Sequence, residues 1–552
     1  MGRKGKDSSG QRAASQVVGE SVHTTSSDGC TTPASEEALS SLRYAERGAL
    51  SSEPLLTAWC NQNGERPAKP ATMAAPGAAK PRALAVAASP EENSSSLEPE
   101  AEQCPAEVRD TKDRGKVFVT LRALEPGEVV LRATPVMEIS RKGQALTIEE
   151  LQRWAYKFML LDSNQRERVL AMSSQKKAAP AGALASLVGK RGEQVAELIR
   201  VPNGVTAEDL WTLFRILESS AFEVAATEES AQVVLLLLGC SMNHSCLPNA
   251  LLGPGAKKGT IEVRTLRPIG AGEEVTISYI DEQSLFRPVA DRRAALSRRR
   301  QFACACDRCA GPDTLRVFRC MRQTCRGSVM ASASDGDGSS SSSTTLTACG
   351  TCGKVPAGHG ASEVLAAEQR ILDVAKEVTR TLQKTAGGLS IALAKRDGAA
   401  FAPASEAAMH ALGTCANLVS SNKQVEPQHF AVAGLAKSAA TLRTLMGDSL
   451  AATNRGELAS KMWGAAAGEL GEAIQNEYKA LPLPRDGRIM DLVGVAGLLS
   501  RLAKPEAAQR YFEDALNDIR LIGWACAPSR REELESMRQG VEAALADIKS
   551  ST

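Results

Sequence analysis

Cysteine spacing constrains the fold of this chain more than any other feature of its sequence. Eight of the 14 cysteines lie between Cys246 and Cys352, mostly in short pairs. The chain starts without the apolar segment of a secretory signal, so these clusters indicate metal ligands rather than disulfides. Such ligands need a reducing compartment, and we therefore expect the protein to be cytoplasmic, nuclear or both.

The first cluster predicts a zinc site. The pattern Cys304-x-Cys306-x2-Cys309 places three soft ligands so close together that few uses other than metal binding exist for them. A structural zinc ion takes four ligands, which leaves this triplet one ligand short. Cys246 can supply the fourth thiolate from a distant segment.

A second cluster follows along the chain. Its members are Cys320, Cys325, Cys349 and Cys352, separated in the middle by a low-complexity, serine-rich loop at residues 331–347. Four thiolates brought together across this loop would complete a second structural zinc site. The alternative is a set of reduced surface cysteines without a metal.

Composition and periodicity divide the chain into regions. Residues 1–110 are rich in Ser, Ala, Glu, Gly and Pro and have too little apolar surface to offset chain entropy, so we expect disorder. Strands are expected at 117–119, 129–131, 259–266 and 274–279, with a helical pattern from about 147 to 229. From 362 to 552 the chain predicts helices only, at 363–386, 405–421, 428–446, 455–479, 491–502, 505–523 and 529–549.

Charge and hydropathy exclude several classes of protein. The 66 Lys and Arg residues nearly balance the 64 Asp and Glu residues, and the chain has no basic stripe, so direct nucleic-acid binding is not expected. The longest apolar run, Val233–Leu238, is far shorter than the ~20 residues of a membrane span. We therefore expect no membrane association.

Four short segments carry the side chains that chemistry needs. They are Arg114–Phe118, Asn243–Ala250, Gly272–Asp281 and Phe302–Cys309. Alone, each has an ordinary structural explanation: an Asn-His pair is often a polar loop, and a tyrosine at the end of a strand often packs with its hydroxyl in water. Their occurrence together and in this order is what needs explaining.

In that order the segments resemble the SET-domain protein lysine methyltransferases, in particular the SET-and-MYND subfamily. Two motifs carry the resemblance, Asn-His-Ser-Cys-x-Pro-Asn at 243–249 and Gly-Glu-Glu-x-Thr-Ile-Ser-Tyr at 272–279. It covers about residues 112–310. It implies an α+β protein with a β-rich SET domain at 111–310, a helical insertion at 143–232 and a cysteine-rich post-SET zinc segment at 302–310. A second cysteine-rich zinc segment at 311–361 and an all-α, TPR-like helical-repeat domain at 362–552 would follow.

The resemblance also implies a role for particular residues. S-adenosylmethionine would be held by Gly115, Lys116, Asn243, His244 and Phe302. Tyr279 would be the catalytic residue, at the mouth of the lysine channel beside the transferred methyl group. The zinc held by Cys246 and the post-SET triplet would tie the segment carrying His244 to the segment carrying Phe302.

Four departures from the family pattern bear on activity. There is no cysteine between Cys104 and Cys240, so we expect the MYND zinc module to be absent. Val117 replaces the second glycine of the first loop, and its Cβ can crowd a close backbone approach to the cofactor. Ser220 stands in place of an asparagine, and Arg300 in place of a tyrosine.

Two hypotheses follow for function. The leading one is an S-adenosylmethionine-dependent N-methyltransferase that modifies lysine on a histone or another protein. The alternative is a catalytically weak SET-fold scaffold that acts through protein partners bound by its helical C-terminal domain. Val117, Ser220 and Arg300 favour the scaffold, whereas Asn243, His244 and Tyr279 favour the enzyme.

Overall fold

The structure is a computed structural model that describes residues 104–112, 114–142, 146–172, 182–199, 205–224, 230–332, 344–395 and 398–551. Most of the predicted disordered region, 1–110, and most of the serine-rich loop lie outside these ranges. The last part of the disorder prediction is wrong, because strand β1 occupies Ala106–Thr111 and pairs with β2 at Gly115–Thr120. This pairing provides hydrogen-bond partners for the backbone N–H and C=O groups of a segment whose composition does not indicate a strand.

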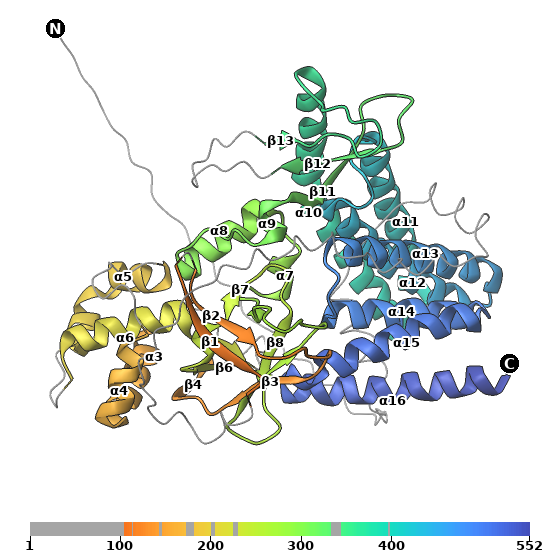
Figure 1. Cartoon of the computed structure of the whole chain (residues 1–552). Coiled ribbons are helices and arrows are strands. Elements are labelled where there is room, and N and C mark those ends of the chain that lie inside the picture. The colour runs from red at the N-terminus through yellow and green to blue at the C-terminus, as the bar shows by residue number, and fades with distance from the viewer. Residues whose placement is uncertain are drawn as a thin grey trace, which may run out of the picture.

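Short sheets form the centre of the molecule, as Figure 1 shows. One sheet has the order β3-β9-β8, another has the order β4-β6-β5, and β7 pairs with β10. The bounds are Val129–Ala133 for β3, Met137–Lys142 for β4, Phe222–Val224 for β5, Ser230–Leu235 for β6, Asn243–His244 for β7, Ala250–Pro254 for β8, Ile261–Thr265 for β9 and Thr276–Ile277 for β10. Segments far apart in sequence therefore meet in this region.

Strand β9 shows how local pattern builds the central core. Ile261 and Val263 alternate along it and are both buried, in one apolar cluster with residues of β3 and β8. Glu262, between them, is also completely buried, which a carboxylate tolerates only when it is paired. Its partners are Arg132 at 2.9 Å and Arg264 at 2.6 Å.

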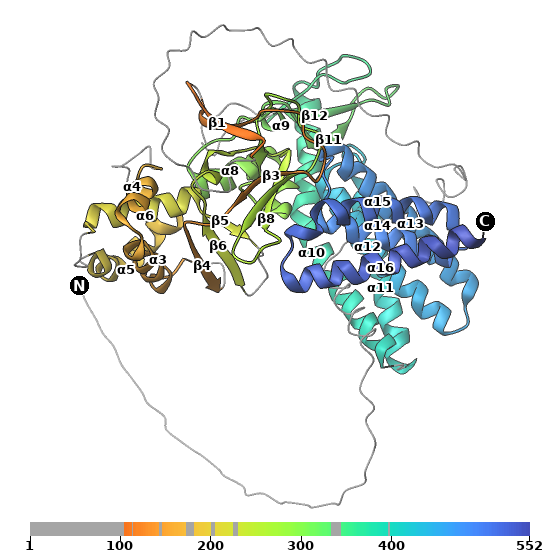
Figure 2. The same ribbon diagram turned by 60° about the horizontal axis from the view of Figure 1, so that its bottom comes forward.

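Where the structure describes the insertion, it contains four helices on one side of the strands (Figure 2). They are α3 at Ile148–Leu160, α4 at Ser163–Leu170, α5 at Gly182–Ile199 and α6 at Ala207–Ser220. The start of α3 is as predicted, since the Thr147 side chain accepts a hydrogen bond from the Glu150 amide. The predicted helical pattern, which ran to residue 229, is too long, since β5 begins at Phe222. The chain is extended there because β6 pairs with β4 on one side and with β5 on the other.

Short elements surround the two cysteine clusters. Next to the first are η2 at Gly239–Ser241, α7 at Glu282–Leu285, α8 at Val289–Arg300 and α9 at Asp307–Ala310. The second lies on a three-stranded sheet of β11 at Pro312–Arg319, β12 at Ser328–Ser332 and β13 at Thr345–Leu346. The sequence analysis did not predict this small sheet, because β13 has only two residues and the pairing of β11 with β12 is interrupted by a shift of register.

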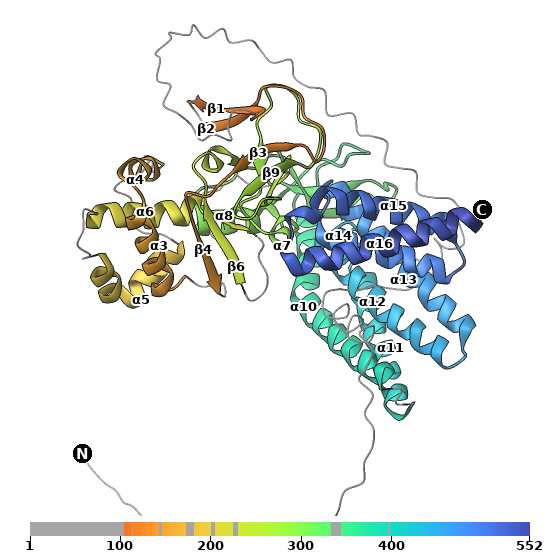
Figure 3. The ribbon, with the colours of Figure 1, turned by 90° about the horizontal axis from the view of Figure 1, so that it is seen from below.

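The C-terminal region is helical, as predicted, and occupies the side opposite the insertion (Figure 3). Its helices are α10 at His359–Ala394, α11 at Gly398–Ser421, α12 at Phe430–Ala452, α13 at Gly456–Ala480, α14 at Asp486–Arg501, α15 at Pro505–Ile522 and α16 at Pro528–Ser551. Within the described ranges, none of the helices combines the length and apolarity needed to cross a bilayer.

The helical region and the central region share a core. One apolar cluster contains Leu296 and Cys309 from the central region together with Ile489 and Ile519 from α14 and α15. The Glu282 carboxylate also accepts hydrogen bonds from the backbone amides at the start of α14, which leave no partner within the helix. The two regions are thus packed as one body.

Candidate active site and zinc centres

The parallel pair β7–β10 brings two of the predicted motifs together. Its register sets Asn243 opposite Thr276 and His244 opposite Ile277. Tyr279, just beyond β10, donates its backbone N–H to His244 Nδ1 at 3.0 Å. The residues that the sequence placed in separate motifs are therefore neighbours in space.

Three rings gather at this point. The His244 ring centroid lies 5.4 Å from that of Tyr279 and 6.2 Å from that of Phe302, and the Tyr279 and Phe302 centroids are 6.3 Å apart. Phe302 arrives from α8 through Gln301, whose φ of 59° ends the helix in the left-handed conformation. That turn directs the chain back toward β7.

Asn243 connects the first predicted loop to the rest of the site. Its Nδ2 donates to the Lys116 carbonyl at 3.2 Å and to Glu274 Oε1 at 2.8 Å. Glu274 is in turn paired with Arg114 at 2.6 Å. Gly115, beside Lys116, has a φ of +64° and open space at its Cβ position, so glycine both permits the β1–β2 turn and leaves the backbone approachable.

His244 joins these groups to the first cysteine cluster. Since its Nδ1 accepts the Tyr279 amide, the ring proton lies on Nε2, which is 3.2 Å from the Cys246 sulfur. Burial lowers the pKa of His244 to about 4, so the ring is neutral at physiological pH. A neutral histidine donating to a thiolate is a typical supporting contact for a metal ligand.

The four cysteines of the first cluster fit a tetrahedral zinc site. The sulfurs of Cys246, Cys304, Cys306 and Cys309 all lie within 4.8 Å of one another, and those of Cys246 and Cys309 are 3.5 Å apart. Zn–S bonds of ~2.3 Å in a tetrahedron require separations close to this. The structure thus supplies the distant ligand that the triplet lacked, while the metal itself stays a prediction.

The four cysteines of the second cluster also fit a tetrahedral zinc site. The sulfurs of Cys320, Cys325, Cys349 and Cys352 lie within 4.8 Å of one another, with separations of 3.6 Å and 3.7 Å for two of the pairs. The backbone explains their approach, because the Cys320 amide donates to Gly327 and the Cys349 amide to Lys354. This geometry favours the zinc site over unrelated surface thiols.

Tyr279 is partly buried between two apolar clusters. Its hydroxyl donates to the Met242 carbonyl, and burial raises its pKa to about 12. The phenol therefore keeps its proton at physiological pH. It can orient an amine by hydrogen bonding, but it is not suited to act as a phenolate base.

The three departures at the predicted site occupy different environments. Val117 is 3% exposed in β2, and Ser220 ends α6 with its carbonyl 3.7 Å from the Cys240 sulfur. Arg300, the last residue of α8, places its guanidinium carbon 5.0 Å from the Tyr279 ring centroid. Only Arg300 thus touches a predicted catalytic side chain directly.

Sequence reasoning missed several supporting residues. Asn249 is 1% exposed, accepts the Thr276 amide at 2.7 Å and donates to the Glu274 carbonyl at 2.8 Å, which locks β10 beside β7. Arg292 and Arg308 contact the first cysteine cluster, at the Cys309 sulfur and the Cys246 carbonyl. Asn249 stood inside a quoted motif, but the arginines carry no signal in sequence because their partners are distant.

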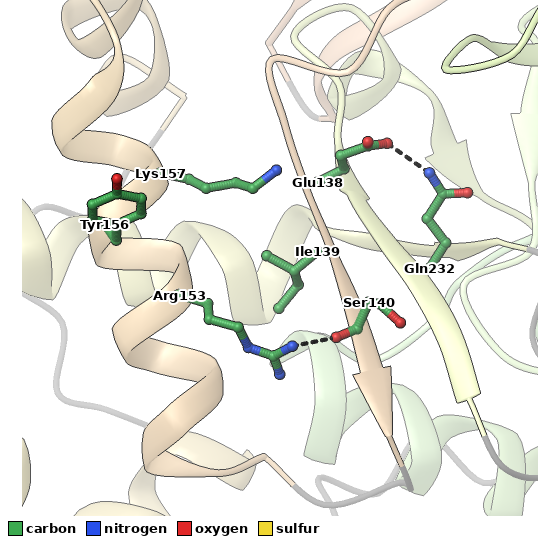
Figure 4. Close-up of a pocket in the computed structure, with 7 residues that line it drawn as sticks. All are labelled: Glu138, Ile139, Ser140, Arg153, Tyr156, Lys157 and Gln232. Carbon is green, nitrogen blue, oxygen red and sulfur yellow. Dashed lines mark hydrogen bonds between the residues drawn. The ribbon is translucent and has the colours of Figure 1, made fainter.

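A separate surface pocket of about 460 Å³ lies between α3 and the β4–β6 pair (Figure 4). Arg153 spans it to the Ser140 carbonyl at 2.7 Å, and Glu138 accepts a hydrogen bond from Gln232 at 2.6 Å. None of the residues that line it belongs to the ring cluster. It is a feature of the insertion rather than part of the candidate active site.

Part of the chain is similar to known proteins. A model of the SET domain family matches residues 115–280. N-lysine methyltransferase SMYD2-B of Xenopus laevis is 46% identical over 70 residues, which are 12% of this chain and 15% of that protein. Protein-lysine N-trimethyltransferase SMYD5 of Danio rerio is 37% identical over 75 residues, which are 14% of this chain and 18% of that protein.

A solved structure was also compared, the SET domain of LSMT bound to lysine and AdoHcy. It aligns with 80% of this chain and 89% of its own, at a TM-score of 0.25 and 13% identity. An overlap of that degree is too low to support an inference about this chain.

The protein contains a SET domain, joined to a C-terminal region of α-helices. Proteins similar to part of this chain include SMYD-type protein-lysine methyltransferases, and the matched segments cover only a small part of each relative's length. The predicted fold class and the predicted resemblance are thereby confirmed. The absence of a MYND module stays a prediction.

Proposed function

We propose that this protein is an S-adenosylmethionine-dependent protein-lysine N-methyltransferase. The observation that carries the proposal is the convergence of His244, Tyr279 and Phe302, whose ring centroids lie 5.4–6.3 Å apart, beside the Asn243 contact to Lys116. These are the residues to which the family resemblance assigns cofactor binding and lysine positioning, and they come from separate segments.

Some residues of the chain would bind the cofactor, and another would orient the acceptor amine. Gly115, Lys116, Asn243, His244 and Phe302 would hold the cofactor, which when bound supplies an electrophilic methyl group. Methyl transfer is an in-line displacement, so holding donor and amine in line supplies much of the rate. The protonated Tyr279 hydroxyl would orient the acceptor amine.

The acceptor lysine must be neutral before transfer. Its unperturbed pKa is ~10.4, so the site has to disfavour the ammonium form. Burial beside Phe222 and Tyr279 would do this, because a charge is costly in apolar surroundings. The first zinc would hold the segments carrying His244 and Phe302 together and thereby maintain the binding geometry.

The proposal also names the protein's partners and its cellular compartment. A protein with an accessible lysine would be the substrate, and the helices α10–α16 offer a surface for further protein partners. We place the protein in the cytoplasm, the nucleus or both, since the two thiolate clusters need a reducing compartment. We also propose that it has no MYND module, because its sequence has no cysteine between Cys104 and Cys240.

Calorimetric titration of the full chain with S-adenosylmethionine tests the proposal. We expect saturable binding at one site per chain. A wild-type protein that does not bind the cofactor would contradict the enzyme hypothesis and leave the scaffold hypothesis. In that case Val117→Gly distinguishes an enzyme that has lost activity, which would regain binding, from a chain with an interaction role only.

A further inference from the structure

The two cysteine clusters differ in the groups that surround their sulfurs. In the first cluster each sulfur accepts a hydrogen bond from an N–H group. The four contacts are His244 Nε2 to Cys246 at 3.2 Å, the Cys306 amide to Cys304 at 3.5 Å, the Cys246 amide to Cys306 at 3.4 Å, and Arg292 Nη2 to Cys309 at 3.5 Å. Two of the donors are thus side chains, and one of these is a cation.

Two arginines bury positive charge beside the first cluster. Arg292 is 1% exposed and donates Nη1 to the Arg287 carbonyl at 2.6 Å. Arg308 donates Nη1 to the Cys246 carbonyl at 3.0 Å. Three further nitrogens, Arg292 Nε and Arg308 Nε and Nη2, are buried without a hydrogen-bond acceptor. Buried cationic donors are costly unless an anion lies beside them, so their position fits a cluster of thiolates.

The charges around these arginines fit a zinc tetrathiolate. Arg293 brings a third guanidinium, which donates to the carbonyls of two cysteines of the cluster at 3.0 Å and 3.2 Å. Asp313, a buried carboxylate, attracts both Arg292 and Arg308. Three arginines and one aspartate leave two net positive charges. A zinc ion with four thiolates carries two net negative charges, which balances them.

The second cluster has a different environment. Its sulfurs accept from backbone amides, such as that of Gly327 to Cys325 at 3.4 Å. Among the residues that the structure describes, no arginine or histidine side chain donates to any of the four sulfurs. Two of its cysteines, Cys325 and Cys352, are partly exposed, against Cys306 alone in the first cluster. The sheet β11–β13 beside it lies at the edge of the molecule (Figure 1).

We propose that Arg292 and Arg308 make the zinc site of the first cluster resistant to oxidation, so that peroxides release zinc from the second cluster first. Bound zinc already keeps every ligand deprotonated, so a nearby cation does not increase the thiolate fraction. It only lowers the intrinsic nucleophilicity of the sulfur. Because the first zinc would join the segments carrying His244 and Phe302, the site between them would outlast the loss of the second metal.

The oxidation consumes two thiolates and one peroxide. A thiolate attacks a peroxide oxygen, the O–O bond breaks, and a sulfenic acid forms. A second thiolate then displaces hydroxide from that sulfur and closes a disulfide. Two electrons pass from sulfur to hydrogen peroxide, which takes up two protons and becomes two water molecules. Zinc leaves as Zn²⁺, because a disulfide is not a thiolate ligand.

The test uses the full chain purified with zinc at both clusters. Hydrogen peroxide is added, zinc release is followed with a chromogenic chelator, and peptide mass spectrometry identifies the disulfides. We expect the first equivalent of zinc to leave as the second cluster is oxidised, and the other equivalent to leave at least about tenfold more slowly. Cys349→Ser, which should hold only the first zinc, should show the slow release alone.

Arginine variants test the cause of this difference. Arg292→Met removes a cation and a sulfur donor at similar bulk and should speed release from the first cluster by about tenfold or more, with the second cluster unchanged. Arg308→Met should act in the same direction. Arg298→Met, at an exposed arginine of α8, is the matched control and should release zinc as wild type does.

Equal release rates at the two clusters, earlier release from the first cluster, or fewer than two zinc ions per chain would overturn the inference. So would unchanged release from the first cluster in the arginine variants that fold, as judged by near-ultraviolet circular dichroism. If Arg292→Met does not fold, Arg308→Met replaces it, and the comparison of wild type with Cys349→Ser needs no arginine variant. Methyl transfer is not measured, so the outcome is independent of the proposed function.

Discussion

At the scale of single residues, Tyr279 combines a partly buried ring with a hydroxyl that donates to the Met242 carbonyl. Tyr279→Phe keeps the ring contacts with His244 and Phe302 and removes only that hydroxyl. We expect cofactor affinity to be retained and methyl transfer to fall by about 10²-fold, since the Tyr279 hydroxyl oxygen would accept a hydrogen bond from the reacting amine and orient it. Tyr156→Phe, at a tyrosine that is 60% exposed, is the matched control and should change neither quantity.

If Tyr279→Phe lost cofactor affinity by the same factor as it lost methyl-transfer rate, the role of the Tyr279 hydroxyl in orienting the amine would be contradicted. Calorimetry and single-turnover kinetics on the same preparations separate the two effects.

His244 belongs to both the ring cluster and the first cysteine cluster. His244→Ala removes a ring from the cofactor side and the donor to the Cys246 sulfur, so we expect no measurable S-adenosylmethionine binding in calorimetry. His410→Ala, at an exposed histidine of α11, should bind as wild type does. Unchanged affinity in His244→Ala would remove this residue from the cofactor site.

At the scale of elements, the sheet β11–β13 depends on its cysteines because it is small. Metal analysis of the full chain should give two zinc ions, and Cys349→Ser should give one, since a structural site rarely survives with three ligands. Cys415→Ser is the control, because Cys415 is buried in α11 outside both clusters. One zinc in the wild type, unchanged by Cys349→Ser, would exclude the second site.

A buried ionic cluster holds β11, α10 and α12 together. The Glu368 carboxylate is paired with Arg316 at 2.7 Å and accepts from His429 Nε2 at 3.0 Å. Burial opposes ionisation of Glu368, but these two partners outweigh it and lower its pKa from 4.5 to about 2. Burial also lowers the pKa of His429 below 6.5.

Both shifts act on stability in the same direction. Below pH 6.5 the unfolded His429 takes up a proton that the folded one resists, and below pH 4.5 the unfolded Glu368 does the same. The stabilisation is therefore complete above pH 6.5 and is lost progressively as the pH falls toward 2. Urea unfolding at a series of pH values should show this decline.

Removing the carboxylate tests the cluster directly. Glu368→Ala leaves the Arg316 charge buried and should lower the free energy of unfolding by about 3 kcal/mol at neutral pH. The matched control is Glu377→Ala on the same helix, where the pair with Arg380 is exposed and should matter by less than about 0.5 kcal/mol. Equal effects in the two variants would show that the Glu368 cluster does not carry the stability assigned to it.

At the scale of the whole molecule, the helical region contributes to the site through the core that it shares with the central region. Ile489, fully buried in α14, belongs to the cluster against which Tyr279 and Phe302 pack. Ile489→Ala should lower stability by about 2–5 kcal/mol and also weaken cofactor binding. Ile371→Ala, equally buried in α10 but in another cluster, should lower stability without changing affinity. Equal affinities in the two variants would contradict this coupling.

Features that depend on local pattern or on motif spacing could be predicted from the amino-acid sequence. The C-terminal helices follow from their 3.6-residue period, and Thr147 marks the start of α3 because its cap bonds lie within four residues. The Cys304–Cys309 spacing indicates zinc, and the two motifs at 243–249 and 272–279 indicate a SET domain, without reference to any tertiary contact. Those signals are local or carried by order along the chain.

Contacts between groups that are distant in sequence could not be predicted and are seen only in the folded chain. The pairing of β1 with β2, the small sheet β11–β13 and the approach of Cys246 to the triplet all depend on contacts across the chain, which periodicity does not encode. The same is true of Arg300, which in sequence is one of three consecutive arginines. Its guanidinium lies over the Tyr279 and Phe222 rings and donates to the Ala221 carbonyl next to β5, and these contacts arise only in the folded chain.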